Sequence, residues 1–400
     1  MSIKVLILNP YFPTLGGGEK HMAHFCKFIE DYIDDVEIDI LVHNYNNIDI
    51  FSKDYPDIKI FKERFNIELN KTKILKVNLQ NQETYLRNLL NKFKLESITK
   101  KYDLFVNFMY QSKHIGRAKR NIYICMFPPY KYQFEGNIKR LIGKALDYLF
   151  KRSYDYFIVN SEYTNHWQQF IWKTGRKNKI VYPPVFSREL LKKRNLDQKK
   201  NIILSVGRFF VGSHNKKQEE LVDIFIRNYK KFKGWELHLA GALSNFPADV
   251  AYVENIKSKS NGYPIYIHLN LSFEELELLY RYAKIYWHAT GYKENESIFP
   301  EKMEHFGITT VEAMSYGVVP VVIRKGGQTE IVKEGENGFL WETEEECVLK
   351  TGRLINDEEL WKRLSSQAIK RSEDFSVEEF YKKMKGIFDE LRYFDYHSKL

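Results

Sequence analysis

Short runs of apolar residues recur along the chain, and most stretches between them repeat apolar positions with the spacing of amphipathic helices. The first run, residues 3–8, is apolar apart from Lys4 and is typical of a strand buried on both faces. Runs that predict further strands cover residues 36–42, 104–108, 122–126, 156–159, 202–207, 236–240, 265–269, 285–288, 318–323 and 338–341. Strands that alternate with helices in this way predict parallel α/β sheets.

The alternation pauses once, near the middle of the chain. Residues 180–185 predict a last strand that two consecutive prolines end, and residues 187–200 are polar, rich in Lys and Arg, and without a strand pattern. We therefore predict an N-terminal α/β domain at residues 1–186, a linker at 187–200 and a second α/β domain at 201–376. With 400 residues, 44% of them hydrophobic, the chain can bury two full cores.

Composition argues against three classes of protein. No apolar run approaches the roughly 18–20 residues of a membrane-spanning helix, and the first apolar stretch is too short for a signal peptide. Three scattered cysteines, Cys26, Cys125 and Cys347, give neither a disulfide framework nor a metal-site spacing. We therefore expect a cytoplasmic protein rather than a transmembrane protein, a disulfide-rich secreted protein or a cysteine-type zinc protein.

The chain is basic, with 62 Lys and Arg against 52 Asp and Glu and a net charge of +10. Most of the excess lies in residues 111–152, where two acidic side chains, Glu135 and Asp147, oppose ten basic ones. The ten are Lys113, Arg117, Lys119, Arg120, Lys131, Lys139, Arg140, Lys144, Lys151 and Arg152. Such a concentration of charge indicates a specific acidic partner. Because no known DNA- or RNA-binding motif accompanies it, we expect no nucleic-acid partner.

Residues 138–152 also have the pattern of an amphipathic basic helix. One apolar stripe combines Ile138, Leu141, Ile142, Ala145, Leu146 and Leu149, and the cations fall mostly away from it. This combination suits an anionic membrane surface or a diphosphate lipid. The stripe could equally be the core-facing side of an ordinary domain helix, and both interpretations stay open.

The stretch at residues 300–314, PEKMEHFGITTVEAM, is the most informative for chemistry. A helix is predicted to start near Thr309, so that residues 306–308 present backbone N–H groups at a helix N-terminus, where a phosphate binds favourably. Glu304 lies in the loop before this helix and Glu312 in its first turn, and both carboxylates could accept hydrogen bonds from sugar hydroxyls. Alternatively, Thr309 and Glu312 form a capping box and Glu304 is an exposed loop acid.

A second cluster follows the predicted strand at residues 202–207. Arg208 comes immediately after the strand, and Lys216 and Lys217 lie in the loop beyond it. Because ligands bind at the carboxyl ends of strands in open α/β sheets, these cations could hold phosphate oxygens and stabilise a diphosphate leaving group. A solvated basic loop is the alternative.

Three glycines, Gly16, Gly17 and Gly18, follow the first strand and would let the backbone approach a phosphate or substrate closely. Their spacing matches neither a dinucleotide-binding nor a P-loop motif, and a tight turn without a ligand is the alternative. His288 and His305 are single histidines beside the predicted site, and we interpret them as satisfied within the protein or solvent-facing. No metal site is predicted.

The chain resembles glycosyltransferase family 4 over nearly its whole length. The residues that carry the resemblance are, in chain order, Gly16-Gly17-Gly18-Glu19, Gly207-Arg208-Phe209, Lys216, Glu304 and Glu312, and the run EHFGITTVEAMSYGVVPVV is the most specific part. The resemblance implies the GT-B fold, in which two Rossmann-like domains face each other across a cleft. It also implies that the last helix, here about residues 377–396, crosses back to the first domain.

The same resemblance implies retaining transfer from a nucleotide-diphosphate sugar, without a metal or another cofactor. Arg208 and Lys216, with Lys217 as the alternative, would hold the donor diphosphate, and Glu304 would face the donor sugar. Glu312 would bind the ribose hydroxyls. The other substrate-binding residues would be Gly16, Gly17 and Gly18 from the N-terminal domain and His305, Phe306, Gly307, Ile308 and Thr309 around the phosphate.

Many members of that family carry a histidine after the strand that here covers residues 122–126, whereas this chain has Cys125 and Met126 there. We therefore assign no general base, and front-face departure and attack, assisted by the leaving phosphate, is our hypothesis. The expected acceptor is a lipid-linked or polysaccharide glycan, with residues 111–152 on the inner face of a membrane. The alternatives are a transferase that uses a soluble or protein acceptor and a catalytically silent sugar-nucleotide-binding subunit.

Overall fold

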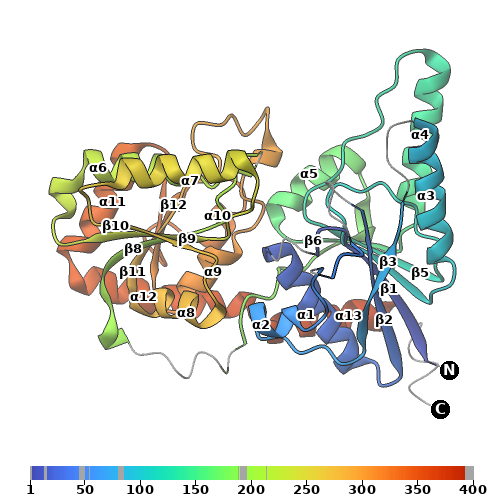
Figure 1. Ribbon diagram of the computed structural model, residues 1–400, viewed down its shortest axis with the longest axis horizontal. Coiled ribbons are helices and arrows are strands. Elements are labelled where there is room, and N and C mark those ends of the chain that lie inside the picture. The colour runs from blue at the N-terminus through green and yellow to red at the C-terminus, as the bar shows by residue number, and fades with distance from the viewer. Residues whose placement is uncertain are drawn as a thin grey trace. The chain divides into compact units, whose positions relative to one another are not determined.

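The computed structural model describes residues 2–12, 16–44, 50–53, 55–79, 85–187, 189, 196–212 and 214–391. Contacts divide the chain into two units, each built on one parallel sheet (Figure 1). Unit 1 comprises Met1–Tyr182 and Tyr381–Leu400, and unit 2 comprises Pro183–Phe380. The expectation of two Rossmann-like α/β domains is confirmed.

Unit 1 contains a sheet of seven strands. In the order of the sheet they are β3 (Thr72–Val77), β2 (Val36–His43), β1 (Ile3–Leu8), β4 (Leu104–Asn107), β5 (Arg120–Cys125), β6 (Tyr156–Val159) and β7 (Asn178–Ile180). The central strand β4 is buried along its whole length, which explains its uninterrupted apolar sequence up to Asn107. The sheet order reverses between β1 and β4, as in Rossmann-like folds.

Helices cover this sheet, and the last one returns to it. They are α1 (Gly17–Tyr32), α2 (Ile60–Phe65), α3 (Tyr85–Thr99), α4 (Asn137–Arg152), α5 (Glu162–Trp172) and the greater part of α13 (Val377–Glu390). The rings of Phe388 in α13 and Phe28 in α1 lie 5.3 Å apart, and the hydroxyl of Tyr32 donates to Asp389 at 2.6 Å. The end of α13 is therefore anchored on α1.

Unit 2 contains a sheet of six strands. In order they are β10 (Ile265–Leu269), β9 (Glu236–Gly241), β8 (Lys200–Val206), β11 (Ala283–His288), β12 (Val319–Ile323) and β13 (Phe339–Trp341). Its helices are α6 (Gln218–Arg227), α7 (Pro247–Ser260), α8 (Phe273–Tyr282), α9 (Ile308–Ser315), α10 (Gln328–Ile331), α11 (Glu344–Asn356) and α12 (Glu358–Ser372). Helices lie on both faces of the sheet (Figure 1), and one core surrounds the buried rings of Trp287 and Trp341.

Three elements differ from the expectation. Strand β3 was not predicted, because two lysines interrupt its sequence TKILKV and the strand lies half-buried at the sheet edge. The strand predicted at residues 180–185 is wrong beyond Ile180, because two prolines without N–H groups cannot continue a ladder. The glycines predicted as a loop or tight turn after the first strand begin helix α1 instead, with Gly16 as its N-terminal cap and Gly17 and Gly18 in its first turn.

Two predicted segments lie partly outside the described residues. These are residues 188 and 190–195 of the predicted linker and residues 392–396 of the predicted last helix. The predicted domain limits at 186, 200 and 376 stay predictions. The two contact units instead meet after Tyr182 and after Phe380.

Candidate active site

The candidate site lies in unit 2, at the carboxyl ends of the adjacent strands β8 and β11. The order of the sheet reverses at this pair, and ligands of open α/β folds bind at such a point. Glycines allow close packing here, because a Cβ on Gly207 would lie 2.7 Å from Lys216 Cγ and one on Gly241 would lie 1.9 Å from the Gly207 carbonyl oxygen. The loop after β8 can therefore place Lys216 against the end of the strand.

Lys216, His288 and Glu304 meet at this position. Lys216 Nζ lies 2.6 Å from Glu304 Oε2, and His288 Nε2 lies 3.0 Å from the same oxygen. Burial of Glu304 by itself raises the pKa of its carboxyl, but Lys216 and His288 more than offset this and hold that pKa well below its usual value. The carboxylate is therefore ionised at neutral pH.

Lys217 points away from this centre, although it directly follows Lys216. Its backbone is left-handed, with φ of 58°, at the N-terminal cap of α6. Its Nζ lies 3.0 Å from Glu294 Oε1, and Lys302 Nζ lies 3.0 Å from Glu294 Oε2. The three side chains line a polar cavity of about 430 Å³. Of the two lysines, Lys216 is the one that contacts Glu304.

Helix α9 begins one residue earlier than predicted, directly after Gly307. The first hydrogen bonds of this turn run from the N–H groups of Thr310 and Val311 to the Gly307 carbonyl, so the N–H groups of Ile308 and Thr309 precede them. Gly307 has φ of 120°, and a Cβ there would lie 2.5 Å from Gln328 Nε2. Glycine is therefore required for the chain to enter the helix in this way.

The capping-box alternative for Thr309 and Glu312 is wrong. Gly307 is the N-terminal cap, no side chain caps it, and Glu312 lies beyond the first turn, which corrects its predicted position. The hydroxyl of Tyr286 donates to Thr309 Oγ1 at 2.7 Å, and the hydroxyl of Tyr280 donates to Glu312 Oε2 at 2.8 Å. Tyrosines from β11 and α8 thus orient both residues.

Arg208 is exposed at the end of β8. Its guanidinium lies 5.8 Å from the centre of the Phe210 ring, and within the described residues it makes no ion pair. Gln218 Nε2 donates to the carbonyl oxygens of Gly207 and Arg208 at 3.0 and 3.1 Å, which fixes the backbone that carries the guanidinium. The side chain is therefore placed to meet an anion from solvent.

The side chains of His305 and Phe306, which the sequence predicts around the donor phosphate, are buried. His305 Nε2 lies 3.1 Å from the Glu301 carbonyl oxygen, and its ring stands 4.5 Å from that of His214. Burial lowers the pKa of both histidines, that of His214 to about 4. The Phe306 ring packs 5.3 Å from Phe375. Both side chains therefore pack within unit 2, and the substrate-binding role of the two residues stays a prediction.

The glycine loop belongs to unit 1, whereas the other predicted site residues belong to unit 2. The Gly16 N–H donates to Glu19 Oε2 at 2.8 Å, so the loop closes on its own helix. A Cβ on Gly18 would lie 3.2 Å from Met126 Sδ. Cys125 is buried, which raises the pKa of its thiol, and Sγ contacts Gln168 Oε1 at 3.2 Å. Neither Cys125 nor Met126 supplies a general base.

Within the described part of the chain, four of the ten basic side chains in residues 111–152 are paired with acids. The pairs are Lys113 with Asp147, Arg117 with Glu96, Lys119 with Asp103 and Arg120 with Asp155. Three of these acids lie outside the segment, so the local sequence overstates its free charge. Within the described part of the chain, no helix is long and apolar enough to cross a bilayer.

The apolar stripe of α4 faces outward. Ile138 is 78% exposed and Leu141 is 69% exposed, and Ile142 and Leu149 are also exposed. The helix instead buries Gly143, Asp147 and Phe150. The interpretation of this stripe as a core-facing side is therefore wrong.

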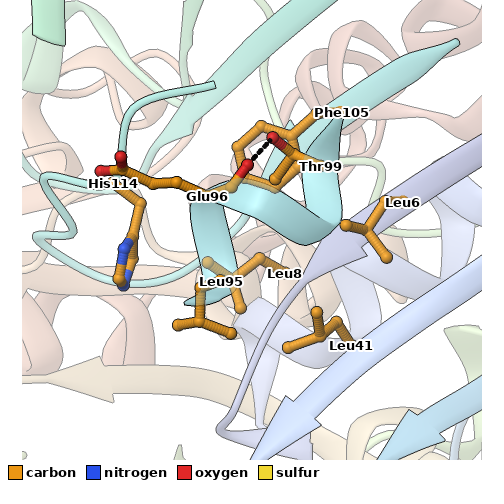
Figure 2. A pocket seen from close by; sticks show the side chains of 8 residues that line it. All are labelled: Leu6, Leu8, Leu41, Leu95, Glu96, Thr99, Phe105 and His114. Atoms are coloured by element: carbon orange, nitrogen blue, oxygen red, sulfur yellow. Dashed lines mark hydrogen bonds between the residues drawn. The ribbon is translucent and has the colours of Figure 1, made fainter. Parts of the chain in front are cut away.

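A small cavity in unit 1 is part of the hydrophobic core and not a site. Its volume of about 10 Å³ is at most that of one water molecule. Figure 2 shows leucines around it, with Glu96 and Thr99 joined by the hydrogen bond from Thr99 Oγ1 to the Glu96 carbonyl oxygen. Arg117 pairs with the Glu96 carboxylate at 2.9 Å. Among the described residues, no group of three His, Cys, Asp or Glu side chains could hold a metal ion.

Residues 186–371 match the family model of glycosyl transferases group 1. An uncharacterised glycosyltransferase of Haemophilus influenzae is 28% identical over 274 residues, which are 67% of this chain and 70% of that protein. The chain is a nucleotide-sugar-dependent glycosyltransferase. The segment that matches the family model contains Arg208, Lys216, Glu304 and Glu312, so the candidate site of this glycosyltransferase lies within it.

The chain is also similar in sequence to a mannosyltransferase and in fold to a solved structure. The Dictyostelium discoideum GDP-Man:Man(3)GlcNAc(2)-PP-Dol alpha-1,2-mannosyltransferase is 29% identical over 237 residues, which are 56% of this glycosyltransferase but 45% of that enzyme. The crystal structure of Anabaena HepE with UDP and glucose has a TM-score of 0.68 at 16% identity and covers 97% of this chain and 100% of its own. The fold of the glycosyltransferase is therefore GT-B.

Proposed function

We propose that the enzyme transfers a sugar, with retention of configuration, from a UDP- or GDP-sugar to a lipid-linked or polysaccharide acceptor. The observation that carries this proposal is the ionised Glu304 carboxylate, held by Lys216 and His288 beside the start of α9. A carboxylate there can accept a hydrogen bond from a donor-sugar hydroxyl. The nearby N–H groups and cations can meet the diphosphate.

In this proposal, residues of the candidate site assist the departure of the diphosphate and bind the donor. As the bond between the sugar carbon and the diphosphate breaks, negative charge builds on the leaving oxygen. Arg208, Lys216 and the N–H groups of Ile308 and Thr309 stabilise that charge. The acceptor hydroxyl attacks from the same face and gives its proton to the leaving phosphate, so no protein base and no metal is required. Glu312 holds the ribose.

A screen of sugar nucleotides tests the proposal. One UDP- or GDP-sugar should raise the melting temperature and be hydrolysed slowly in the absence of acceptor, with the same rate in EDTA. Melting curves and released nucleotide diphosphate are the measurements. Binding without any turnover would identify a silent sugar-nucleotide-binding subunit instead, and loss of turnover in EDTA would contradict the metal-free mechanism.

The membrane surface is the proposed second partner. The exposed apolar stripe of α4 and its neighbouring cations support it, because Lys139, Arg140 and Lys144 are all exposed and make no ion pair within the described residues. Apolar side chains can enter the headgroup region while the cations contact anionic lipids. The dolichol-linked acceptor in the name of the Dictyostelium relative is consistent with a lipid-linked substrate.

We expect the triple variant Lys139→Ser, Arg140→Ser, Lys144→Ser to bind vesicles containing phosphatidylglycerol on the order of 100-fold more weakly, at about 1 kcal/mol for each cation. Co-sedimentation measures the partition, which should also fall with salt. The matched control changes three exposed lysines of unit 2, Lys230, Lys231 and Lys233, to serine. Equal losses in both triple variants would contradict a membrane face on α4.

A further inference from the structure

His288 is the last residue of β11 and lies at the centre of the candidate site. Its side chain is 3% exposed, and β11 pairs with β8, the strand that Arg208 follows. Besides Glu304 Oε2 at 3.0 Å, its Nε2 lies 3.2 Å from Thr290 Oγ1. The charged groups at this ring are Glu304 and, through the shared carboxylate, Lys216.

The contacts determine where the proton of the His288 ring lies. A carboxylate only accepts hydrogen bonds, so Nε2 carries the proton that it donates to Glu304. Nδ1 is buried and has no hydrogen-bond partner among the residues that the structure describes, so a second proton there would be an unsatisfied buried donor. Burial also lowers the pKa of His288, and Glu304 offsets this only in part. The ring is therefore the neutral Nε2–H tautomer.

A cationic donor, Lys216, and a neutral donor, His288, share one oxygen of Glu304. Lys216 Nζ and His288 Nε2 contact Oε2, which leaves Oε1 outside both bonds, on a side chain that is 17% exposed. In the proposed function, the donor diphosphate draws Lys216 away from Glu304. The carboxylate would then lose its orientation unless a second donor held it.

We infer that His288 is a positioning residue that fixes Glu304 while Lys216 turns to the donor diphosphate. Its neutral N–H holds Oε2 throughout the reaction, and Oε1 stays aimed at the donor sugar. This inference rests on the proposed function. It assigns His288 no contact with substrate and no proton transfer.

Two variants separate positioning from structure. In His288→Gln the side-chain amide can donate from about the place of Nε2, whereas His288→Met is apolar and cannot donate. We expect His288→Met to lower turnover of the donor sugar on the order of 10- to 100-fold, as displaced catalytic groups do. His288→Gln should recover most of that loss, and the affinity of both variants for the free nucleotide diphosphate should equal that of the wild type.

A spectrum of the protein labelled with ¹⁵N-histidine tests the tautomer without any turnover. The His288 resonance, assigned by its loss in His288→Gln, should show a protonated Nε2 and an unprotonated Nδ1 at neutral pH. A proton on Nδ1, wild-type turnover in His288→Met, or equal loss in both variants at unchanged melting temperature would overturn the inference. Absence of turnover in the wild type would instead contradict the proposed function, and the tautomer would still decide the role of His288.

Discussion

Replacing Glu304 by glutamine should lower turnover of the donor sugar on the order of 100- to 1000-fold, because the group that faces the sugar in the proposed function loses its charge. The amide has the shape of the carboxylate, and its oxygen can still accept the His288 N–H, so the fold should persist. Lys216 loses its anionic partner and becomes more available to the diphosphate. We therefore expect the loss in kcat, with little change in KM for the donor. Steady-state hydrolysis and transfer rates measure it.

The matched control for this variant is Glu336→Gln, which removes one carboxylate from an exposed turn of the same unit. Its turnover should equal that of the wild type. If Glu304→Gln kept full turnover, or if it lost affinity for the free nucleotide as well, Glu304 would not be the group that faces the donor sugar.

Most of the fold could be predicted because its strands are buried on both faces. Such strands have continuous or nearly continuous apolar sequences, as in Val319–Ile323 and, apart from Lys4, in Ile3–Leu8. The order of these runs and of the helices then indicates parallel sheets. The edge strand Thr72–Val77 has polar residues at three of its six positions, Thr72, Lys73 and Lys76, and gave no such run. The strand before the two prolines also ends earlier than its apolar sequence predicts: Val181 donates the last hydrogen bond to β6, and Val185 is buried without pairing with that strand.

Residues of the candidate site could be predicted only where a local sequence motif or the end of a predicted strand marks them. Glu304 and Glu312 lie in one motif, and Lys216 follows a strand end. The partners that hold the two carboxylates lie far away in sequence, because His288 is 16 residues from Glu304 and Tyr280 is 32 residues from Glu312. A single histidine carries no pattern. Its place as the last residue of a predicted strand was the one signal that could have drawn attention to it.

The two adjacent lysines make opposite contacts, and this distinguishes their proposed roles. The left-handed backbone of Lys217 turns its side chain to Glu294, where Lys302 already supplies a second cation. Lys216 is the cation on Glu304, and burial of that carboxyl would raise its pKa if Lys216 were absent. In the proposed function Lys216 therefore acts twice, on the leaving diphosphate and on the ionisation of Glu304.

Lys216→Met should lower kcat/KM for the donor on the order of 100- to 1000-fold, because one of the cations that stabilise the leaving diphosphate is lost. The pH profile should change as well. With Lys216 gone, burial raises the pKa of Glu304, so the carboxyl takes up its proton at a higher pH as the solution is acidified. The residual activity of Lys216→Met should therefore fall at a higher pH than that of the wild type. Rates measured across the acid range give both quantities.

Lys217→Met is the matched control, one residue away and equal in chemistry. Lys302 still pairs with Glu294 in that variant, so its kcat/KM should fall far less and its acid limb should coincide with that of the wild type. The reverse order of the two variants would transfer the diphosphate role to Lys217. An unshifted acid limb in Lys216→Met would mean that His288 alone keeps Glu304 ionised, and the contribution of Lys216 would then be confined to the diphosphate.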